Sequence, residues 1–527
     1  MPRFINSKAL SDLLASDRPH ALLDVREHGE FNAAHIHGAS WLPRRRIEMD
    51  ARVLAPSNGT LLVVCDDDGR RAALAAETLE RLGYADVHVL DGGLNRWVTD
   101  GMSTEWGVNV VSKEFGERVF ETTDFPEVSP DELYQWQAEG QNVVLLDSRT
   151  PEEHSFATIP GSRSLPGGEL ALRFDALAVA KDAKVVVHCA GRTRSIVGAH
   201  TLRRMGVPNV YGLKNGTMGW TMAGYEVESG SPRVDLPSVS PAVEAAAATR
   251  AESLAAKDGV RFIAPEDLRA LIATSDQQNV YLIDPRTREE YAAGHIPGFR
   301  WFPGGQAVQR SDEVMAVRQG HVVFACDGTV RSSMSASWFR QMGFPNVYVA
   351  TGGITAWAAA GHEVEQGHSG SGSDLDALKS VARISSSTLL ERLSGVGQSA
   401  IMFVGTSREF AGGHIRGARW IPRGWLEFHI GDVAAIDDAV VVTCNDGVQS
   451  SMAAGTLLDL GYSRASFLDG GVSAWRGAGL PLETGLVGVG SPPNDVVLAG
   501  TERTFAEMMQ YLRWEEELGH KYRSQPG

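Results

Sequence analysis

The sequence predicts an α/β protein made of four tandem domains, each an open parallel sheet flanked by helices on both faces. Short β-branched runs, LLVVC, VVVHC, VVFAC and VVVTC, end at Cys65, Cys189, Cys326 and Cys444, and such runs are typical of buried parallel strands. Each run is followed by a polar, Gly-containing loop and then by a helical pattern that closes at a glycine, as in AALAAETLERLGY. Strand, tight loop and helix therefore form a unit that recurs four times.

Other landmarks recur in the same order around each cysteine. Upstream lie ALLDVRE, VLLDSRT, YLIDPRT and IMFVGTSRE, and then AHIHGA, ATIPGS, GHIPGF and GHIRGA. Downstream lie VLDGG, GLKNG, VATGG and FLDGG, which are followed by Trp97, Trp220, Trp357 and Trp475. Because ligands of open parallel sheets bind at the carboxyl ends of the strands, the four cysteines that end the strands are candidate site residues.

The 527-residue chain is too long for one compact core, and its composition suggests where it divides. The expected domains are residues 1–105, 127–228, 260–366 and 376–485. Residues 229–259 start Pro/Ser-rich and continue Ala-rich, which favours a linker with a helical part. Residues 486–527 form a tail with a capped amphipathic helical pattern. We expect this helix to pack on a domain or between domains, and the alternative is that it binds a partner.

The composition excludes several classes of function. The formal charge is -16, which disfavours generic binding to nucleic acid or to an anionic membrane, so an anionic substrate has to be attracted locally. No apolar run approaches the roughly 20 residues of a membrane span, and the start lacks the apolar stretch of a signal peptide, so we expect a cytoplasmic location. Four cysteines without a CxxC pair indicate neither a disulfide framework nor a metal site, and we expect no cofactor.

The repeated motifs together carry a family resemblance. A strand-end Asp-x-Arg, a GHIPGA-like segment, a cysteine that opens a loop such as CAGRTRS, and a late GG-x-x-x-W resemble the rhodanese family of sulfurtransferases. The resemblance covers nearly the whole chain as four tandem rhodanese-like domains. It implies a five-stranded parallel sheet between helices in each domain.

Sulfur transfer places two requirements on the loop that follows the cysteine. The loop must stabilise a thiolate that attacks a sulfane sulfur, and it must hold the resulting persulfide or an attached oxyanion. Successive N–H groups at the positive end of the following helix meet both requirements. An arginine adds an anion clamp, and glycines allow the backbone to close around one atom.

The second domain has the loop best suited to this chemistry, with Cys189 as the expected nucleophile. Its loop contains two arginines, no acidic residue and a serine placed as helix N-cap or persulfide hydrogen-bond donor. The expected sulfur-binding residues are Gly191, Arg192, Thr193, Arg194 and Ser195. Asp147 and Arg149 are expected to form a supporting polar pair at a strand end. We interpret His188 as structural, because strand alternation points it to the opposite face.

The third domain carries a second candidate nucleophile, Cys326. The expected sulfur-binding residues are Gly328, Arg331 and Ser332, with Asp284 and Arg286 as the supporting pair. Asp327 lies next to the thiol, and a carboxylate there disfavours the thiolate and repels an anion, while Arg331 offsets it. We therefore expect Cys326 to be active but less so than Cys189.

The second and third domains share a further arginine. LPGGELALR places Arg173 seven residues beyond Pro166, and FPGGQAVQR places Arg310 seven beyond Pro303. Both arginines are expected either to face the pocket from its opposite rim or to lie on the surface.

The first and fourth domains depart from the pattern, so Cys65 and Cys444 are weaker candidates. The fourth-domain loop has Gln449 in place of the arginine, and Gly405 replaces the strand-end aspartate. Without a cation, an oxyanion gains much less binding energy.

The first domain has one extra residue between Cys65 and the helix-closing glycine. If it lies in the loop, Arg71 aligns with Arg194 and Arg331, and the longer loop resembles that of the cell-cycle phosphatases. Three consecutive aspartates at 66–68 oppose both thiolate formation and phosphate binding, so a structural or regulatory role is favoured.

These observations lead to two hypotheses of function. The first is a sulfurtransferase that moves sulfur by a ping-pong route from thiosulfate or a thiol persulfide to cyanide or a thiol acceptor. The second is a scaffold that binds a sulfur-carrier protein while one domain does the chemistry. A phosphatase-like first domain is a third, weaker alternative.

Overall fold

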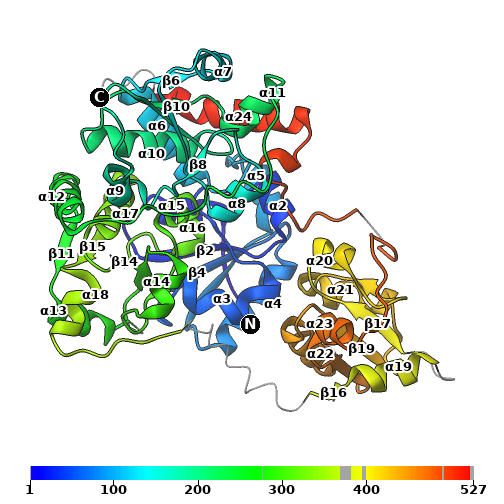
Figure 1. Ribbon diagram of the computed structural model, residues 1–527. Helices are drawn as coiled ribbons and strands as arrows, with labels where there is room; N and C mark the ends of the chain where they lie inside the picture. The colour runs from blue at the N-terminus through cyan, green and yellow to red at the C-terminus, as the bar shows by residue number, and fades with distance from the viewer. Residues whose placement is uncertain (1, 276, 368–380, 395–398, 490–491, 523–527) are drawn as a thin grey trace.

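The computed structural model describes residues 2–275, 277–367, 381–394, 399–489 and 492–522 (Figure 1). These residues form four five-stranded parallel sheets, and all four share one strand order. In the first sheet the order is β1-β5-β4-β2-β3, and the other three repeat it with their own strands. Helices flank each sheet, so the prediction of four tandem α/β domains with parallel sheets is confirmed.

The first domain contains β1 (Arg3–Ile5), β2 (His20–Asp24), β3 (Ser40–Trp41), β4 (Leu61–Cys65) and β5 (Asp86–Leu90), with α1 (Ser7–Leu14), α2 (His28–Ala33), α3 (Ile47–Leu54), α4 (Arg70–Arg81) and α5 (Gly93–Thr99). Helix α6 (Val110–Thr122) connects it to the second domain. The second domain contains β6 (Glu127–Val128), β7 (Val143–Asp147), β8 (Arg163–Ser164), β9 (Lys184–His188) and β10 (Val210–Leu213), with α7 (Pro130–Ala138), α8 (Pro151–Phe156), α9 (Leu170–Arg173), α10 (Thr193–Arg204) and α11 (Gly216–Met222).

Helix α12 (Pro241–Lys257) lies between the second and third domains in the chain. The third domain contains β11 (Arg261–Ile263), β12 (Val280–Asp284), β13 (Arg300–Trp301), β14 (His321–Phe324) and β15 (Asn346–Ala350), with α13 (Pro265–Ile272), α14 (Arg288–Ala293), α15 (Gly304–Gln309), α16 (Ser311–Val314), α17 (Val330–Gln341) and α18 (Gly353–Ala359). The fourth contains β16 (Arg383–Ile384), β17 (Ala400–Phe403), β18 (Arg419–Trp420), β19 (Val440–Thr443) and β20 (Ala465–Leu468), with α19 (Ser386–Ser394), α20 (Ser407–Gly412), α21 (Leu426–His429), α22 (Val448–Asp459) and α23 (Gly471–Gly477). Helix α24 (Phe505–Gly519) belongs to the tail.

Strand register brings the candidate residues of each domain to one edge of its sheet. In the first domain Asp24 pairs with Cys65, and in the second Asp147 pairs with His188, the residue before Cys189. The strand-end aspartate and the cysteine loop therefore meet at the carboxyl edge of the sheet, where ligands of such sheets bind.

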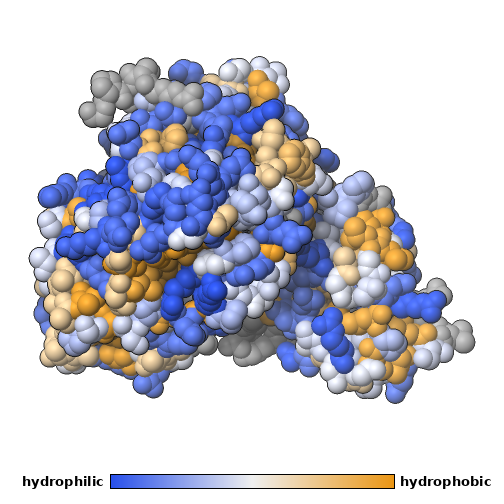
Figure 2. Space-filling view, turned by 45° about the horizontal axis from the view of Figure 1, so that its top comes forward, coloured by the Kyte–Doolittle hydropathy of each residue, from blue (hydrophilic) through white to orange (hydrophobic). Residues whose placement is uncertain are grey.

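The hydrophobic cores divide the molecule into two unequal parts. One continuous cluster of buried side chains runs through the first three domains, α6 and α12, whereas the buried clusters of the fourth domain contain only its own residues. In Figure 1 the fourth domain, yellow to orange, is a separate lobe beside the other three. Figure 2 shows a largely hydrophilic surface with scattered hydrophobic groups, some of them on this lobe. None of the described helices is long and apolar enough to cross a membrane.

Two pairs of domains, the first with the fourth and the second with the third, meet through the same segment of the repeat. Arg44 donates to Glu427 at 2.6 and 2.9 Å, and Arg423 donates to Glu48 at 2.9 Å, so the first and fourth domains exchange reciprocal ion pairs. In the second and third domains the corresponding segments are Pro-Gly-Gly, and a Cβ added at Gly168 would lie 3.1 Å from the Gly304 nitrogen. Glycine is required at this contact because the two backbones approach so closely.

The tail returns from the fourth domain to the second. Asn494 lies against Gly29 of the first domain, and α24 packs on α6. Figure 1 shows α24 in red beside α6 and α11, on the side of the second domain. The tail thereby contacts the loop that follows β9, with Glu515 at 3.4 Å from the hydroxyl of Thr193.

Candidate active site

Each of the four cysteines lies at the carboxyl end of the central strand of its sheet, and a helix begins a few residues later. Helices α10, α17 and α22 begin four residues after Cys189, Cys326 and Cys444, whereas α4 begins five residues after Cys65. The extra residue of the first domain therefore lies in the loop. All four thiols are buried and none forms a disulfide.

The Cys189 loop offers N–H groups that have no acceptor in the described chain. No hydrogen bond from the backbone nitrogens of residues 190–195 is found among the described residues. The Sγ of Cys189 lies 3.6 Å from the hydroxyl of Ser195, which donates to the carbonyl of Arg192 at 2.6 Å. Buried N–H groups at a helix N-terminus are stabilised by an anion, so this loop is suited to hold a persulfide or an oxyanion.

The two arginines of this loop are held by carboxylates. Arg194 forms two hydrogen bonds of 2.7 Å with Glu153. Although burial raises the pKa of Glu153, Arg194 lowers it to about 2, so the pair stays ionised. Arg192 turns away to Glu117 of α6, at 2.6 and 2.8 Å. Of the two, Arg194 is the cation that stays beside α8 and the strand end.

The supporting residues of the second domain form a buried polar network. Arg149 donates to Asp147 at 2.6 to 3.2 Å, and the same carboxylate accepts from Thr158 at 2.9 Å. His188 lies 2.7 Å from the hydroxyl of Ser162. Burial lowers the pKa of His188 to about 4, although Asp147 acts to raise it, so this imidazole is neutral.

A cavity of about 560 Å³ opens onto the Cys189 loop and is lined by the second domain and by four other parts of the chain. The residues from outside the second domain include His28 and Trp41 of the first domain, Val108, Asn109 and Lys113 of the connector, Gln309, Arg310 and Glu313 of the third domain, and residues 497–500, Arg503, Tyr511 and Glu515 of the tail. The candidate site is therefore composite. No local signal in the sequence could have placed Lys113 or the tail residues beside Cys189.

The Cys326 loop is enclosed by acidic side chains. Arg331 donates to Glu169 at 2.9 Å, to Glu290 at 2.6 Å and to Asp327 at 2.8 Å. The Sγ of Cys326 lies 3.2 Å from the hydroxyl of Ser332. Burial, and then Asp327, raises the pKa of Cys326 to about 11, while Arg331 acts in the opposite direction.

Helix α12 covers the same loop from the linker. Thr329 donates to Glu252 at 2.6 Å, and a Cβ added at Gly328 would lie 3.4 Å from a carboxylate oxygen of Glu244. The supporting pair is formed as in the second domain, with Arg286 donating to Asp284 at 2.6 to 3.1 Å. The third domain thus has the loop but surrounds it with carboxylates.

Arg173 and Arg310, the arginines that the second and third domains share in sequence, each lie close to the other domain. Arg310 of the third domain lines the Cys189 cavity, where it is paired with Glu313. Arg173 of the second domain donates to Glu169 at 2.6 Å and lies 3.4 Å from Glu290, a partner of Arg331. Each arginine is therefore near the cysteine loop of the neighbouring domain.

The Cys444 loop is closed around its own sulfur. The Sγ accepts from the N–H groups of Gly447 at 3.2 Å and Ser450 at 3.4 Å. Asn445 donates to Glu409 at 3.0 Å. Burial raises the pKa of the Cys444 thiol, although Ser450 acts to lower it.

The Cys65 loop is occupied by a carboxylate of the protein. Asp66 is fully buried and accepts from the N–H groups of Gly69, Arg71 at 2.7 Å and Ala72 at 3.3 Å. The guanidinium of Arg71 lies 3.9 Å from the centre of the Trp425 ring of the fourth domain. Burial, and then Asp24, raises the pKa of Cys65 well above its usual value.

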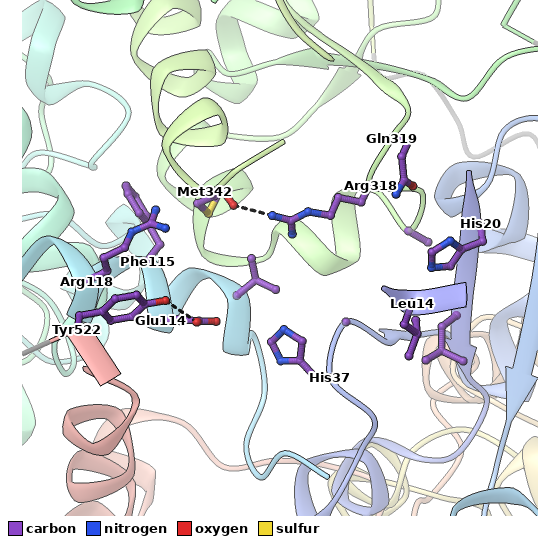
Figure 3. Close-up of a pocket in the computed structure, with 14 residues that line it drawn as sticks. Leu14, His20, His37, Glu114, Phe115, Arg118, Arg318, Gln319, Met342 and Tyr522 are labelled. Carbon is purple, nitrogen blue, oxygen red and sulfur yellow. Dashed lines mark hydrogen bonds between the residues drawn. The ribbon is translucent and has the colours of Figure 1, made fainter. Parts of the chain in front are cut away.

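A second cavity, of about 370 Å³, contains no cysteine (Figure 3). It lies where the first domain, α6, the third domain and the chain end meet. Its labelled residues are Leu14, His20, His37, Glu114, Phe115, Arg118, Arg318, Gln319, Met342 and Tyr522. Two hydrogen bonds cross it, from Tyr522 to Glu114 at 2.6 Å and from Arg318 to the carbonyl of Met342 at 2.8 Å. The first contact joins the tail to α6, whereas the second lies within the third domain.

Comparison with known proteins identifies the class. The rhodanese-like domain model matches residues 6–100, 129–223, 264–360 and 387–478, so the chain belongs to the rhodanese-like family. A crystal structure of a thiosulfate sulfurtransferase from Pseudomonas aeruginosa is similar over 99% of this chain and 98% of its own, with 35% identity and a TM-score of 0.91. The expected family resemblance is confirmed.

Curated relatives match single domains or pairs of domains. A sulfurtransferase from Allochromatium vinosum is 31% identical over 19% of this chain and 92% of its own length. The putative thiosulfate sulfurtransferase SseB of Mycobacterium tuberculosis is 28% identical over 32% of this chain and 71% of its own. The probable adenylyltransferase/sulfurtransferase MoeZ of the same species is 33% identical over 18% of this chain, but the match spans only 24% of MoeZ. These relatives support a transferase role.

Proposed function

We propose that the protein is a sulfurtransferase in which Cys189 carries the transferred sulfur as a persulfide. The Cys189 thiolate attacks the outer sulfur of thiosulfate, the bond between the two thiosulfate sulfurs breaks, and sulfite leaves with the electron pair. Cyanide or a thiolate then takes the outer sulfur and restores the cysteine thiolate. With a thiol persulfide as donor, the leaving group is the thiolate instead of sulfite.

The observation that supports Cys189 is the set of N–H groups of residues 190–195 without an acceptor in the described chain. In the first domain the corresponding N–H groups already bind Asp66, and in the fourth two of them bind Cys444 itself. An incoming sulfur anion at Cys189 therefore displaces no ligand that the described residues supply. Arg194, beside the same loop, supplies the positive charge.

Cys326 is proposed as a second, slower site. Its loop keeps an arginine and a serine at the positions that they have in the second domain, but Asp327 and Glu290 neutralise Arg331. A thiol with a pKa of about 11 is almost entirely protonated near neutral pH. Thiolate formation then limits its reaction with a sulfur donor.

The first and fourth domains are proposed as structural parts of the assembly. The buried Asp66 occupies the N–H groups that a phosphate would need, which weighs against a phosphatase-like first domain. The reciprocal ion pairs of Arg44 with Glu427 and of Arg423 with Glu48 hold the first and fourth domains together. A scaffold that also binds a sulfur-carrier protein is compatible with this arrangement.

Intact mass spectrometry after incubation with thiosulfate tests the proposal. Wild-type protein is expected to gain the mass of one sulfur atom at Cys189, and Cys189→Ser is expected to gain none there. Cys65→Ser, Cys326→Ser and Cys444→Ser serve as matched variants that keep Cys189. Persulfide formation in the Cys189→Ser variant equal to that in wild type would show that another cysteine carries the sulfur.

A further inference from the structure

Two cations that line the Cys189 cavity form no ion pair with a carboxylate of the described residues. Four arginines that line it are ion-paired: Arg149 with Asp147, Arg192 with Glu117, Arg194 with Glu153 and Arg310 with Glu313. Within the described chain, no carboxylate oxygen lies within 4.0 Å of the Lys113 ammonium or the Arg503 guanidinium. These two side chains are the positive charge that remains available to a ligand.

Lys113 is a buried cation that an anionic ligand would stabilise. The residue is 3% exposed, and its ammonium donates to the carbonyl of Val108, which leaves two of its three hydrogens without an acceptor in the described chain. Burial lowers the pKa of Lys113 to about 8, and Glu515 and Asp312 oppose this only from beyond 4.0 Å. A buried ammonium is costly unless it is paired, so a ligand anion would stabilise it.

Lys113 and Arg503 lie beside the same aromatic ring. The Lys113 nitrogen is 5.3 Å and the Arg503 guanidinium carbon 3.9 Å from the centre of the Tyr511 ring. Tyr511 belongs to α24 and donates to Glu515 at 2.9 Å, and Glu515 in turn lies 3.4 Å from the hydroxyl of Thr193. The tail helix therefore holds this cationic pair next to the Cys189 loop, apart from the arginines of the loop itself.

The cavity is larger than an inorganic donor requires. Its volume of about 560 Å³ falls within the range of sites for organic ligands, roughly 300 to 1,000 Å³. Apolar side chains, including the exposed Phe156 and Leu498, also line it. An organic ligand with its sulfur at Cys189 would meet apolar side chains and a separate pair of cations.

We propose that Lys113 and Arg503 form an anion subsite that binds the carboxylate of an organic thiol, the acceptor of sulfur from Cys189. This inference rests on the proposed function. The acceptor enters as a thiolate after losing its proton to solvent, takes the outer sulfur of the cysteine persulfide and leaves as a persulfide anion. The Cys189 thiolate is restored, and the carboxylate is bound without reacting.

Two acceptors that differ only in charge test the subsite. Protein loaded with thiosulfate and freed of small molecules is mixed with 3-mercaptopropionate or its uncharged amide, and the rate of persulfide loss from Cys189 is measured. We expect wild type to prefer the carboxylate by roughly tenfold to a hundredfold, the gain from a charge-assisted hydrogen bond. Comparing two acceptors on one protein cancels any change in the persulfide itself.

Lys113→Met and Arg503→Gln are each expected to lose most of this preference, and the double variant to show nearly equal rates. Lys8→Met, at an exposed helix position of the first domain, is the matched control and should keep the wild-type ratio. Arg503 is less buried than Lys113, so Arg503→Gln decides the question if Lys113→Met fails to fold. Equal rates for the two acceptors with wild type would overturn the subsite.

Binding of an inert thioether separates this inference from the sulfur-transfer proposal. Calorimetry with 3-(methylthio)propionate and its amide needs no persulfide, and only the carboxylate is expected to bind, in wild type but not in the double variant. If Cys189 takes no sulfur while this binding holds, the sulfur-transfer proposal is wrong and the anion subsite remains. If the carboxylate and the amide bind alike, the subsite is wrong.

Discussion

The loops of the first and second domains differ in whether a carboxylate of the protein binds the N–H groups that follow the cysteine. In the first domain the carboxylate of Asp66 is bound by three backbone N–H groups, and Cys65 lies among further aspartates. In the second domain the N–H groups after Cys189 have no acceptor in the described chain, and the loop contains no acidic residue. One fold thus provides a filled anion site in the first domain, where Asp66 binds the loop, and an available one in the second, where Ala190 follows the cysteine.

The two loops also differ in how accessible they are, because another domain covers the first loop and a cavity adjoins the second. The fourth domain covers the first-domain loop, with Trp425 on Arg71 and Phe428 5.4 Å from Arg70. The second-domain loop opens into a cavity that includes residues of four other parts of the chain. The first-domain loop therefore lies at an interface, whereas the second-domain loop faces a cavity, in agreement with the proposed ligand site.

Replacing the nucleophile should have the largest effect. Cys189→Ser is expected to remove most of the transfer of sulfur from thiosulfate to cyanide, because a hydroxyl cannot form the persulfide. Steady-state rates measure this, with Cys65→Ser as the control that should keep wild-type activity. Retention of more than half of the wild-type rate by Cys189→Ser would overturn the assignment of Cys189 as the nucleophile.

Thiol reactivity should follow the loop charges and depend strongly on pH. Near neutral pH, alkylation is expected to be fastest at Cys189, slower at Cys326 and slowest at Cys65. Because the pKa of Cys326 is about 11, its thiolate fraction should rise about tenfold for each pH unit below that value and then level off. Peptide mass spectrometry after timed alkylation measures the three rates. A faster reaction at Cys65 than at Cys189 at neutral pH would contradict the comparison.

Removing the loop cation should weaken binding of an anionic donor. Arg194→Ala is expected to raise the KM for thiosulfate roughly tenfold or more, since one charge-assisted hydrogen bond is lost. Arg331→Ala, the equivalent change in the third domain, is the matched control and should leave this KM unchanged if Cys189 carries the measured turnover. An unchanged KM in Arg194→Ala would indicate an uncharged donor or another site.

Neutralising Asp66 should make the first loop more like the second. Asp66→Asn keeps the shape and an acceptor oxygen but removes one of the charges that raise the pKa of Cys65, so alkylation of Cys65 should become severalfold faster. Asp68→Asn, a partly exposed neighbour paired with Arg70, is the control and should have less effect. Equal effects would show that net loop charge, and not the buried carboxylate, controls the thiol.

The smallest effect on the two loops is expected from a change at the interface of the first and fourth domains. Arg44→Met leaves Glu427 largely buried without its cation and should weaken the contact by about 1 to 3 kcal/mol. Hydrogen exchange should then increase in α21 and in the 3-10 helix Arg423–Trp425. Arg46→Met, which breaks a half-exposed pair within the first domain, should not have this effect. Unchanged exchange in Arg44→Met would mean that the ion pair contributes little to the contact.

The sequence alone predicted the repeated architecture, because its signals are local. The β-branched runs before each cysteine, the Gly-containing loops and the helical patterns are each readable within about 30 residues, and the four copies reinforce one another. The strand-end pairs, such as Asp147 with Arg149, also follow from short motifs. The loss of the arginine at Gln449 and the run of aspartates at 66–68 were visible in the same way.

The parts of the site that come from elsewhere were not predictable in this manner. Arg192 has the spacing of a loop cation, yet it is bound by Glu117 of the connector helix. Arg173 and Arg310 were expected at the rim of their own pockets or on the surface, and each lies near the loop of the other domain. Side chains that meet across domains leave no regular spacing in the sequence.

What the sequence by itself determined is the fold of each domain and the position of every cysteine at a strand end, since strand pattern and loop chemistry act over short distances. Only the tertiary structure decided which loop binds a carboxylate of the protein, which loop another domain covers and which loop opens into a cavity. Those outcomes depend on packing between domains and on the return of α24 to the second domain. Lys113 and Arg503 are far apart in the chain and become neighbours of one ring because the domains and the tail share buried surface.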